Sequence, residues 1–467
     1  MKDSAKTHSR RQFLKGVGLT GAATLVAGGS TTASAKTSKK AQRAENIIFL
    51  MADGNGAGTM GLAHHWKLQT TGEELEWTKL LSRDDLSFCL QDTRSASSPV
   101  TDSAAAASAW GSGHRVNNGS INYSTDGKPL KPIMQYAKQA GLATGLVTTC
   151  RITHATPAGF ATNVPNRNNE ADILKQYYER EIDVLLGGGA RFFEGKTTEG
   201  ASFNYYKSFE NKGYSVAKDR DGLKAATGAT QLLGIFSDSH IPYVIDRKND
   251  SSLKNVPSLP EMFKSAVSSL EQSEKGYLLQ VEAGRVDHAG HANDPAAILH
   301  DTLEFDETVK AVIDYVDAHP DTLLIVTTDH GTGGCQLNGL GSAYVDSGPA
   351  LDRIEICKGS FESLEKAFLK TGVFDAALFE QTIGIKPTAE QVAEAQGMID
   401  AEVKYLSSAL TSVFAKQLFD LTAIGWTSNN HTSENVELLA FGPGSEQIPT
   451  FVKNYELFQI MRDTLLI

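Results

Sequence analysis

Short apolar runs alternate with amphipathic segments along most of the chain. The runs with the length and composition of buried strands are residues 44–53, 142–150, 182–189, 243–247, 276–282, 322–330 and 436–444. Residues 131–141 predict an amphipathic helix that ends at Gly141, and a longer helix begins at Asp294 and Pro295, which suit its cap and first turn. This alternation predicts an α/β fold whose mostly parallel central sheet is flanked by helices on both faces.

Residues 340–425 break the alternation. They contain charged segments with helical character, such as PTAEQVAEAQGMIDAEVKYLSSALTSVFAKQLFDL. We therefore predict a helical insertion here, either a cap over a functional site or an interface, within one catalytic domain at residues 36–467.

The first 35 residues have the order of features found in an export signal. Arg10 and Arg11 form a twin-arginine pair, a mildly apolar Gly/Ala-rich stretch follows, and Ala33-Ser34-Ala35 resembles a cleavage site. The apolar stretch is too short and too rich in Gly, Ser and Thr for a membrane span. We predict a twin-arginine signal peptide at residues 1–35, export of the folded protein by the twin-arginine machinery, and a periplasmic or secreted mature chain. The alternative is a cytosolic protein with a basic tail.

The charge balance restricts the class of partner. The formal net charge is −11, and residues 1–35 contribute five Lys or Arg and one Asp, so the predicted mature chain is near −15. An acidic protein of this kind is not expected to bind nucleic acid independently of sequence, which requires a basic surface. An anionic substrate would need positive charge supplied locally, and metal ions could supply it.

The cysteines carry little information. Four cysteines allow three pairings if all are bridged, and no two of them have zinc-finger spacing. We interpret them as structural residues.

Acidic residues and histidines follow three of the predicted strands. Asp53 comes after the first strand, Glu282 ends the run at 276–282, and Asp329 and His330 end the run at 322–330. Ligand sites in open α/β sheets form at the carboxyl ends of strands. Each residue alone could be a turn residue, but three strands that deliver such groups to one edge predict a site there.

Two sets of these residues have the composition of zinc sites. Asp287 and His291 are four residues apart and would share a face of a helix, and His431 adds a nitrogen donor. Asp329 and His330 form a second set, with Asp53 available as a bridge. Two ions about 4 Å apart would hold the attacking and leaving oxygens of a displacement reaction.

A third set is built from oxygen donors. Glu282 and the hydroxyl of Thr156, together with Asp53, would suit a harder ion such as magnesium. Asp53 could then contact both this ion and the neighbouring zinc.

The stretch VTDSAAAASAWGSGHR places Asp102 and Ser103 directly before an alanine-rich helix. Two interpretations remain open from these residues alone. Either residue could cap the helix, or Ser103 could be a nucleophile at a helix N-terminus that attracts an anion such as phosphate.

Six blocks in sequence order resemble the alkaline phosphatase family: NIIFLMADGNG, VTDSAAAASAWGSGHRVNNG, THATPAGFATNVPNR, LLQVEAGRVDHAGHAND, LLIVTTDHG and NNHTSENVELLAFGPG. The resemblance spans nearly all of residues 36–467. It implies the alkaline phosphatase-like fold, two zinc ions, one magnesium ion and hydrolysis of phosphate monoesters. Many members form dimers, so a homodimer is open for this chain.

The resemblance also implies roles for individual residues. Ser103 would be the nucleophile that takes the phosphoryl group, Arg167 would grip two phosphate oxygens, and Asp102 would steady that arginine. The metal ligands would be Asp287, His291 and His431 for the first zinc, Asp53, Asp329 and His330 for the second, and Asp53, Thr156 and Glu282 for magnesium.

Two further histidines are placed near this site by the resemblance. His154 and His288 stand where one bacterial branch of the family carries Asp and Lys. We expect them to surround the magnesium and the phosphate and to adjust the ligands from there.

The sequence argues against two other functions and leaves a third open. A sulfatase would carry an arginine two residues after Pro99, where this chain has Thr101. A non-catalytic phosphate- or metal-binding protein would lack the nucleophile or the clamp, and both Ser103 and Arg167 are present. A phosphodiesterase of the same superfamily stays open, because one two-metal core can serve both reactions.

Overall fold

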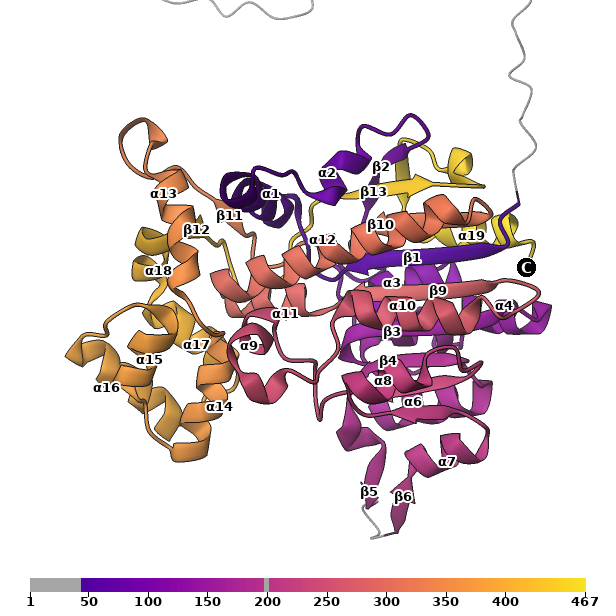
Figure 1. The fold of residues 1–467 in the computed structure, drawn as a ribbon, viewed down its shortest axis with the longest axis horizontal. Helices are drawn as coiled ribbons and strands as arrows, with labels where there is room; N and C mark the ends of the chain where they lie inside the picture. The colour runs from indigo at the N-terminus through magenta and orange to yellow at the C-terminus, as the bar shows by residue number, and fades with distance from the viewer. Residues whose placement is uncertain (1–42, 197–200) are drawn as a thin grey trace, which may run out of the picture. The chain divides into compact units, whose positions relative to one another are not determined.

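The computed structural model describes residues 43–196 and 201–467. The predicted signal peptide at residues 1–35 lies outside this range. Within the described residues a ten-stranded sheet has the order β14-β2-β13-β10-β1-β9-β3-β4-β8-β7 (Figure 1). Its strands are β1 (Asn46–Ala52), β2 (Ser87–Asp92), β3 (Ala143–Arg151), β4 (Val184–Gly188), β7 (Ser215–Ala217), β8 (Leu232–Ile235), β9 (Tyr277–Ala283), β10 (Thr322–Thr327), β13 (Val436–Phe441) and β14 (Phe451–Lys453).

The sheet is parallel except at one strand. β13 runs antiparallel to both of its neighbours, β10 and β2. The strands that carry the predicted site, β10, β1 and β9, are adjacent and parallel, with Ile47 paired to both Leu323 and Leu278. Their carboxyl ends therefore meet at one edge.

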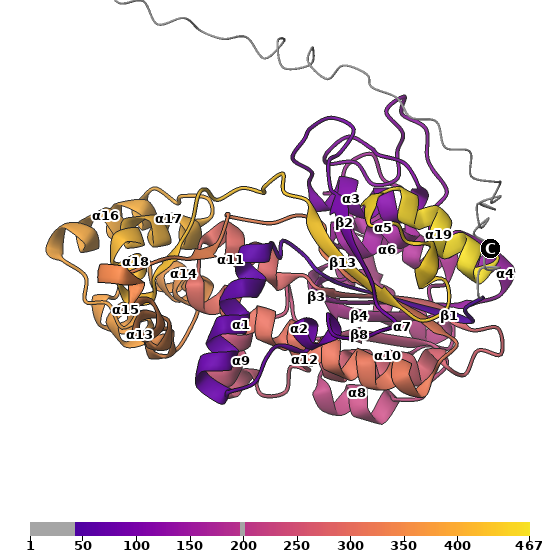
Figure 2. The ribbon, with the colours of Figure 1, turned by 90° about the horizontal axis from the view of Figure 1, so that it is seen from above.

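Helices cover both faces of the sheet, as predicted. All of β1 is buried, and its alternate residues enter two cores: Ile48 and Leu50 one, Ile47 and Phe49 the other. Figure 2 shows the two helical layers. The first core is covered by α1 (Ala57–Thr71), α2 (Glu76–Leu80), α8 (Arg220–Ala226), α9 (Val244–Asn249), α10 (Leu259–Leu270), α11 (Arg285–Ala292) and α12 (Pro295–Ala318); the second by α3 (Ser103–Ser112), α4 (Ile133–Ala140), α5 (Ala155–Ala161), α6 (Glu170–Arg180), α7 (Tyr205–Asn211) and α19 (Glu456–Leu465).

The predicted helix ends are confirmed. Gly141 follows α4 with a φ of 85°, a left-handed conformation that glycine adopts readily. The Asp294 side chain accepts hydrogen bonds from the N–H groups of Ala296 and Ala297 and so caps α12.

The prediction of a strand at residues 243–247 is wrong, because residues Val244–Asn249 form the helix α9. The β-branched Val244 and Ile245 favoured a strand, but the N–H of Val244 donates to the Asp301 carboxylate of α12. The Arg247 Nε also donates to the carbonyl of Pro242, which closes the turn. The sheet strand that precedes this helix in the chain is β8 (Leu232–Ile235), and it was not predicted.

Between residues 342 and 422 the chain forms helices, shown in orange in Figure 1. Strand β11 (Gln336–Leu337) pairs with β12 (Ile424–Gly425) and joins the two ends of this segment. The helices are α13 (Ser347–Asp352), α14 (Phe361–Thr371), α15 (Ala376–Ile383), α16 (Ala389–Asp400), α17 (Leu406–Val413) and α18 (Ala415–Thr422), with η3 (Ser342–Tyr344) and η4 (Arg353–Ile356). The remaining short elements are η1 (Ala190–Phe192), β5 (Glu194–Lys196), β6 (Ser202–Asn204), η2 (Ser251–Leu253) and η5 (Ser445–Gln447).

The four cysteines are unpaired and buried. Among the described residues, no helix has the length and apolar character needed to cross a membrane.

Helices α3 and α5 approach each other closely through two glycines. A Cβ atom on Gly111 would lie 1.9 Å from the carbonyl oxygen of Gly159, and a Cβ on Gly159 would lie 2.5 Å from the Cβ of Ala107. Because Ser103 begins α3 and Thr156 lies in the first turn of α5, this contact sets the position of two predicted site residues.

We expect Gly159→Ala to destabilise the protein by about 1–3 kcal/mol, because the added methyl group has no room between the helices. Denaturant unfolding measures the change. Gly397→Ala in α16 is the matched control, since a Cβ at Gly397 meets no atom within 4 Å. Equal stability of the Gly159→Ala variant and the wild type would contradict this account of the helix contact.

Candidate active site

The site begins at the carboxyl ends of three adjacent strands. Asp53 follows β1, Glu282 is the penultimate residue of β9, and Asp329 and His330 follow β10. All four side chains are buried, with 0–1 % of each residue exposed. The parallel register of β10, β1 and β9 brings these residues, distant in sequence, to one edge.

Asp102 and Ser103 have different surroundings, and these bear on the two interpretations that the sequence left open. Asp102 is the cap of α3, and its Oδ1 accepts a hydrogen bond of 2.9 Å from the N–H of Ala105. Ser103 is the first residue of the helix and only 1 % exposed. Its Oγ lies 3.4 Å from both the Asp53 Oδ1 and the His330 Nε2. The serine hydroxyl therefore faces the cluster of acids and histidines.

Arg167 is held from two sides. Its Nη1 donates to the Asp102 Oδ2 over 3.0 Å, and its Nη2 lies 3.1 Å from the His154 Nε2. The Asp102 Oδ2 also accepts from the N–H of Gly119 over 2.9 Å. One carboxylate thus caps the helix of Ser103 and orients the arginine beside it.

Asp287, His291 and His431 form the first predicted metal cluster. Helix α11 puts Asp287 and His291 on one face, and the Asp287 Oδ1 lies 3.4 Å from the His291 Nε2 and 3.5 Å from the His431 Nε2. The two Nε2 atoms are 2.9 Å apart. Each Nδ1 lies against a backbone carbonyl, that of Asn429 for His291 and that of Thr101 for His431.

This arrangement fits a bound cation. If each Nδ1–H donates to its carbonyl, both Nε2 atoms present lone pairs to each other, and a cation between them relieves the repulsion. A backbone acceptor on the remote ring nitrogen is the usual support of a metal-ligating histidine.

The second predicted cluster adjoins the first. The His330 Nε2 lies 3.0 Å from the Asp329 Oδ2 and 3.6 Å from the Asp53 Oδ1. His330 also belongs to a group with Asp287 and His431 whose ligand atoms all lie within 4.8 Å of one another. The rings of His330 and His431 stack with centroids 3.6 Å apart. The two clusters therefore form one continuous site.

The third predicted set consists of buried oxygens without hydrogen-bond partners. Among the described residues, the Asp53 Oδ2, the Thr156 Oγ1 and the Glu282 Oε1 all lack one. The other Glu282 oxygen accepts from the Thr148 hydroxyl over 2.5 Å. Buried polar atoms are rarely left unpaired, so these three oxygens fit a cation that prefers oxygen ligands.

Burial shifts the protonation of these groups. It raises the pKa of Glu282 to about 7 and, together with the charges of Asp329 and Asp287, raises the pKa of Asp53 well above its usual range. It lowers the pKa of His431 to about 4, which keeps that imidazole neutral. Metals bind neutral imidazoles and deprotonated carboxylates. The lowered pKa of His431 therefore favours metal binding, whereas Glu282 and Asp53, whose pKa values are raised, need a nearby cation to stay deprotonated at neutral pH.

His154 and His288 lie together on the other side of the site. Their ring centroids are 5.5 Å apart, and His240 lies 4.3 Å from His288. The Cys150 Sγ is 3.8 Å from the His288 Nδ1. His154, Glu282 and Cys150 each bring a ligand atom within 4.8 Å of the others.

Several residues of this region were not predicted from the sequence. His240 escaped because it follows β8, the strand that was not predicted. Cys150 and Thr148 were read only as part of a strand, although alternate residues of a strand face the same side. Thr332, whose hydroxyl donates to the Asp287 Oδ1 over 2.6 Å, could have been found as a hydroxyl two residues after Asp329-His330.

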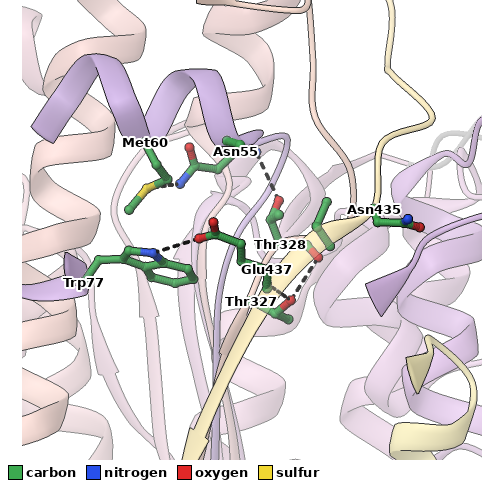
Figure 3. A pocket seen from close by; sticks show the side chains of 9 residues that line it. Asn55, Met60, Trp77, Thr327, Thr328, Asn435 and Glu437 are labelled. Atoms are coloured by element: carbon green, nitrogen blue, oxygen red, sulfur yellow. Dashed lines mark hydrogen bonds between the residues drawn. The ribbon is translucent and has the colours of Figure 1, made fainter. Parts of the chain in front are cut away.

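A small cavity lies behind the strand ends (Figure 3). Its volume of about 20 Å³ has room for about one water molecule. The Asn55 N–H donates to the Thr328 hydroxyl over 3.0 Å, and the Trp77 Nε1 donates to the Glu437 carboxylate over 3.1 Å. The first of these bonds links the backbone two residues after Asp53 to the side chain of the residue directly before Asp329.

Comparison with known proteins agrees with this geometry. The family model described as alkaline phosphatase matches residues 44–467. Alkaline phosphatase 3 of Bacillus subtilis (strain 168) is 34% identical over 453 residues, covering 93% of this chain and 92% of its own. The repressible alkaline phosphatase of Saccharomyces cerevisiae is 30% identical and covers 85% of this chain and 76% of its own. The crystal structure of Thermus thermophilus alkaline phosphatase superposes with a TM-score of 0.83 at 35% identity, over 91% of each chain.

These matches define a phosphoric monoester hydrolase of a metal-dependent family. The chain belongs to the alkaline phosphatase family.

Proposed function

We propose that this enzyme transfers the phosphoryl group of a monoester to Ser103 and then to water, with two zinc ions and an auxiliary magnesium ion. The observation that carries the proposal is the Ser103 hydroxyl, buried at the start of α3 and 3.4 Å from both Asp53 and His330. A serine used only as a cap would not face an acid and a histidine that follow two other elements, β1 and β10.

The donor chemistry assigns the ions to sites. Asp287, His291 and His431 would hold one zinc, Asp329 and His330 with Asp53 the other, and Asp53, Thr156 and Glu282 the magnesium. When bound, the zinc ions would supply Lewis acidity that favours deprotonation of the Ser103 hydroxyl and of the attacking water and stabilises negative charge on the leaving group.

The protein residues then position the reaction. The Ser103 Oγ forms a bond to phosphorus as the bond from phosphorus to the ester oxygen breaks, which leaves a phosphoserine. Arg167, oriented by Asp102, binds two oxygens of the phosphoryl group with its planar fork. The N-terminus of α3 contributes its N–H groups and positive dipole to the same anion. Water then cleaves the phosphoserine and releases inorganic phosphate.

A phosphodiesterase is the second candidate, and turnover of an aryl phosphate monoester against the matching diester distinguishes the two. We expect the monoester to be preferred, because its dianion carries two negative charges on three non-bridging oxygens, whereas a diester carries one charge on two, so Arg167 attracts the monoester more strongly. Arg167→Lys should lower kcat/KM for the monoester by about 10–100-fold and reduce the preference, since lysine is a single point donor. Arg191→Lys, at an exposed pair with Asp238, is the matched control. Faster turnover of the diester by the wild type would refute the proposal.

We further propose that residues 1–35 direct export by the twin-arginine machinery, so that the mature chain begins at Lys36 and acts in the periplasm or outside the cell. The Arg10-Arg11 pair and the Ala33-Ser34-Ala35 sequence support this. A homodimer, which the family resemblance leaves open, remains to be tested by the size of the protein in solution.

A further inference from the structure

Helix α11 carries two of the proposed zinc ligands and is only eight residues long. A helix this short has little stability of its own. The spacing of Asp287 and His291 relative to His431 therefore depends on what holds α11 in place. Figures 1 and 2 show that the neighbours of α11 on one side are helices of the 340–425 segment.

The C-terminal end of α11 is bonded to α17. The last carbonyls of a helix lack partners within the helix. Here the Ser408 Oγ donates to the carbonyl of His291 over 3.1 Å, and the Thr411 Oγ1 donates to the carbonyl of Ala292 over 2.6 Å. Ser408 and Thr411 are three residues apart and share a face of α17, so one helix holds both carbonyls.

The N-terminal end of α11 is bonded to α14. Arg285, 2 % exposed, forms an ion pair with Glu362 in the first turn of α14, and its guanidinium lies 3.8 Å from the Tyr243 ring centroid. Burial raises the pKa of Glu362, but the charges of Arg285 and Lys366 outweigh it and lower that pKa to about 2.

Asp294, two residues beyond the end of α11, is also bonded to α14. The Asp294 Oδ2 accepts a hydrogen bond of 2.8 Å from the N–H of Phe361, the first residue of α14. The 340–425 segment thus contacts α11 at its start, at its end and just beyond it. None of Ser408, Thr411 and Glu362 bonds to Ser103 or Arg167.

We propose that the helical segment 340–425 is a clamp that fixes α11 and thereby sets the zinc affinity of the Asp287–His291–His431 cluster. Ser408, Thr411 and Glu362 are positioning residues in this role. The inference rests on the proposed zinc site. A clamp of this kind differs from a cap that covers the substrate, because its primary effect is on metal binding.

The test measures zinc affinity by competition with a chromophoric chelator, in the full chain. We expect the double variant Ser408→Ala/Thr411→Val to bind the zinc of the Asp287–His291–His431 cluster about tenfold less tightly than the wild type, within the range found for groups that support metal ligands. Excess zinc should restore kcat with KM unchanged. The single variant Thr411→Ser, in which Ser408 is unchanged, keeps the hydroxyl at position 411 and should retain wild-type zinc affinity.

Ser412→Ala is the matched control, because the Ser412 hydroxyl in the same helix donates to the carbonyl of Ala409 and not to α11. Thermal unfolding of the metal-free proteins separates loss of zinc affinity from loss of fold, and Glu362→Gln tests the other end of α11 independently. Zinc affinity in the double variant equal to that of the wild type or of Ser412→Ala would overturn the clamp. No zinc binding by the wild type would instead refute the proposed function.

Discussion

Replacing Ser103 with alanine is expected to reduce phosphate release from an aryl monoester by at least about 10³-fold, because no other hydroxyl takes over as the covalent nucleophile. Ser103 is buried at the start of α3 and its Oγ lies 3.4 Å from Asp53 and from His330. The measurement is steady-state turnover together with acid trapping of labelled phosphate on the protein. The wild type should carry the label on Ser103, and the variant should carry none.

Ser112→Ala is the control for this substitution. Ser112 lies in the same helix and is also buried, but its hydroxyl donates to the carbonyl of Ser108 within the helix. We expect that variant to keep nearly full activity. If Ser103→Ala retained wild-type turnover, or if labelled phosphate remained on it, the covalent mechanism would be abandoned.

Removal of metal ions with a chelator is expected to abolish activity and to lower the unfolding temperature by several degrees. The buried carboxylates of Asp53, Glu282, Asp287 and Asp329 would then face one another without cations, and the protein would lose the stabilisation that a tightly bound ion provides. Activity, elemental analysis and thermal unfolding before and after dialysis against chelator measure the effect. Zinc should restore activity, and magnesium alone should not.

Substitution of a single proposed metal ligand should reproduce this effect at one metal site. His431→Asn is expected to lose one zinc and most activity, whereas His319→Asn, whose ring bonds the carbonyl of Tyr315 at the end of α12, should lose neither. Full activity in the chelated protein, with no metal detected by elemental analysis, would rule out the two-zinc proposal.

Much of the fold follows from local patterns. The runs at 44–53, 276–282 and 322–330 were predicted as buried strands and form β1, β9 and β10. Short continuous apolar runs between helical segments are typical of strands buried on both faces of a parallel sheet. The run at 243–247 failed for a tertiary reason. Its β-branched residues suit a strand, but Asp301 of α12 accepts the N–H of Val244 and stabilises a helix instead.

In the candidate site, too, some residues could be predicted from local sequence pattern and others could not. Asp53, Glu282 and Asp329 were predicted as site residues because each ends an apolar run, a feature visible in the sequence. His240 and Cys150 were not, since one follows a strand that local pattern did not reveal and the other has an ordinary place within a strand. Neither residue has a neighbour in the sequence that indicates its contact with His288.

The sequence by itself determined the strands β1, β9 and β10 that carry the site, the residues offered as metal ligands and the alternatives for Asp102 and Ser103. Each depends on periodicity or residue type over a few positions. Only the tertiary structure decided that Asp102 is the cap while Ser103 faces Asp53 and His330, and that α17 holds the end of α11. Those arrangements arise from contacts between segments far apart in the chain, and they depend on how whole helices pack onto the sheet.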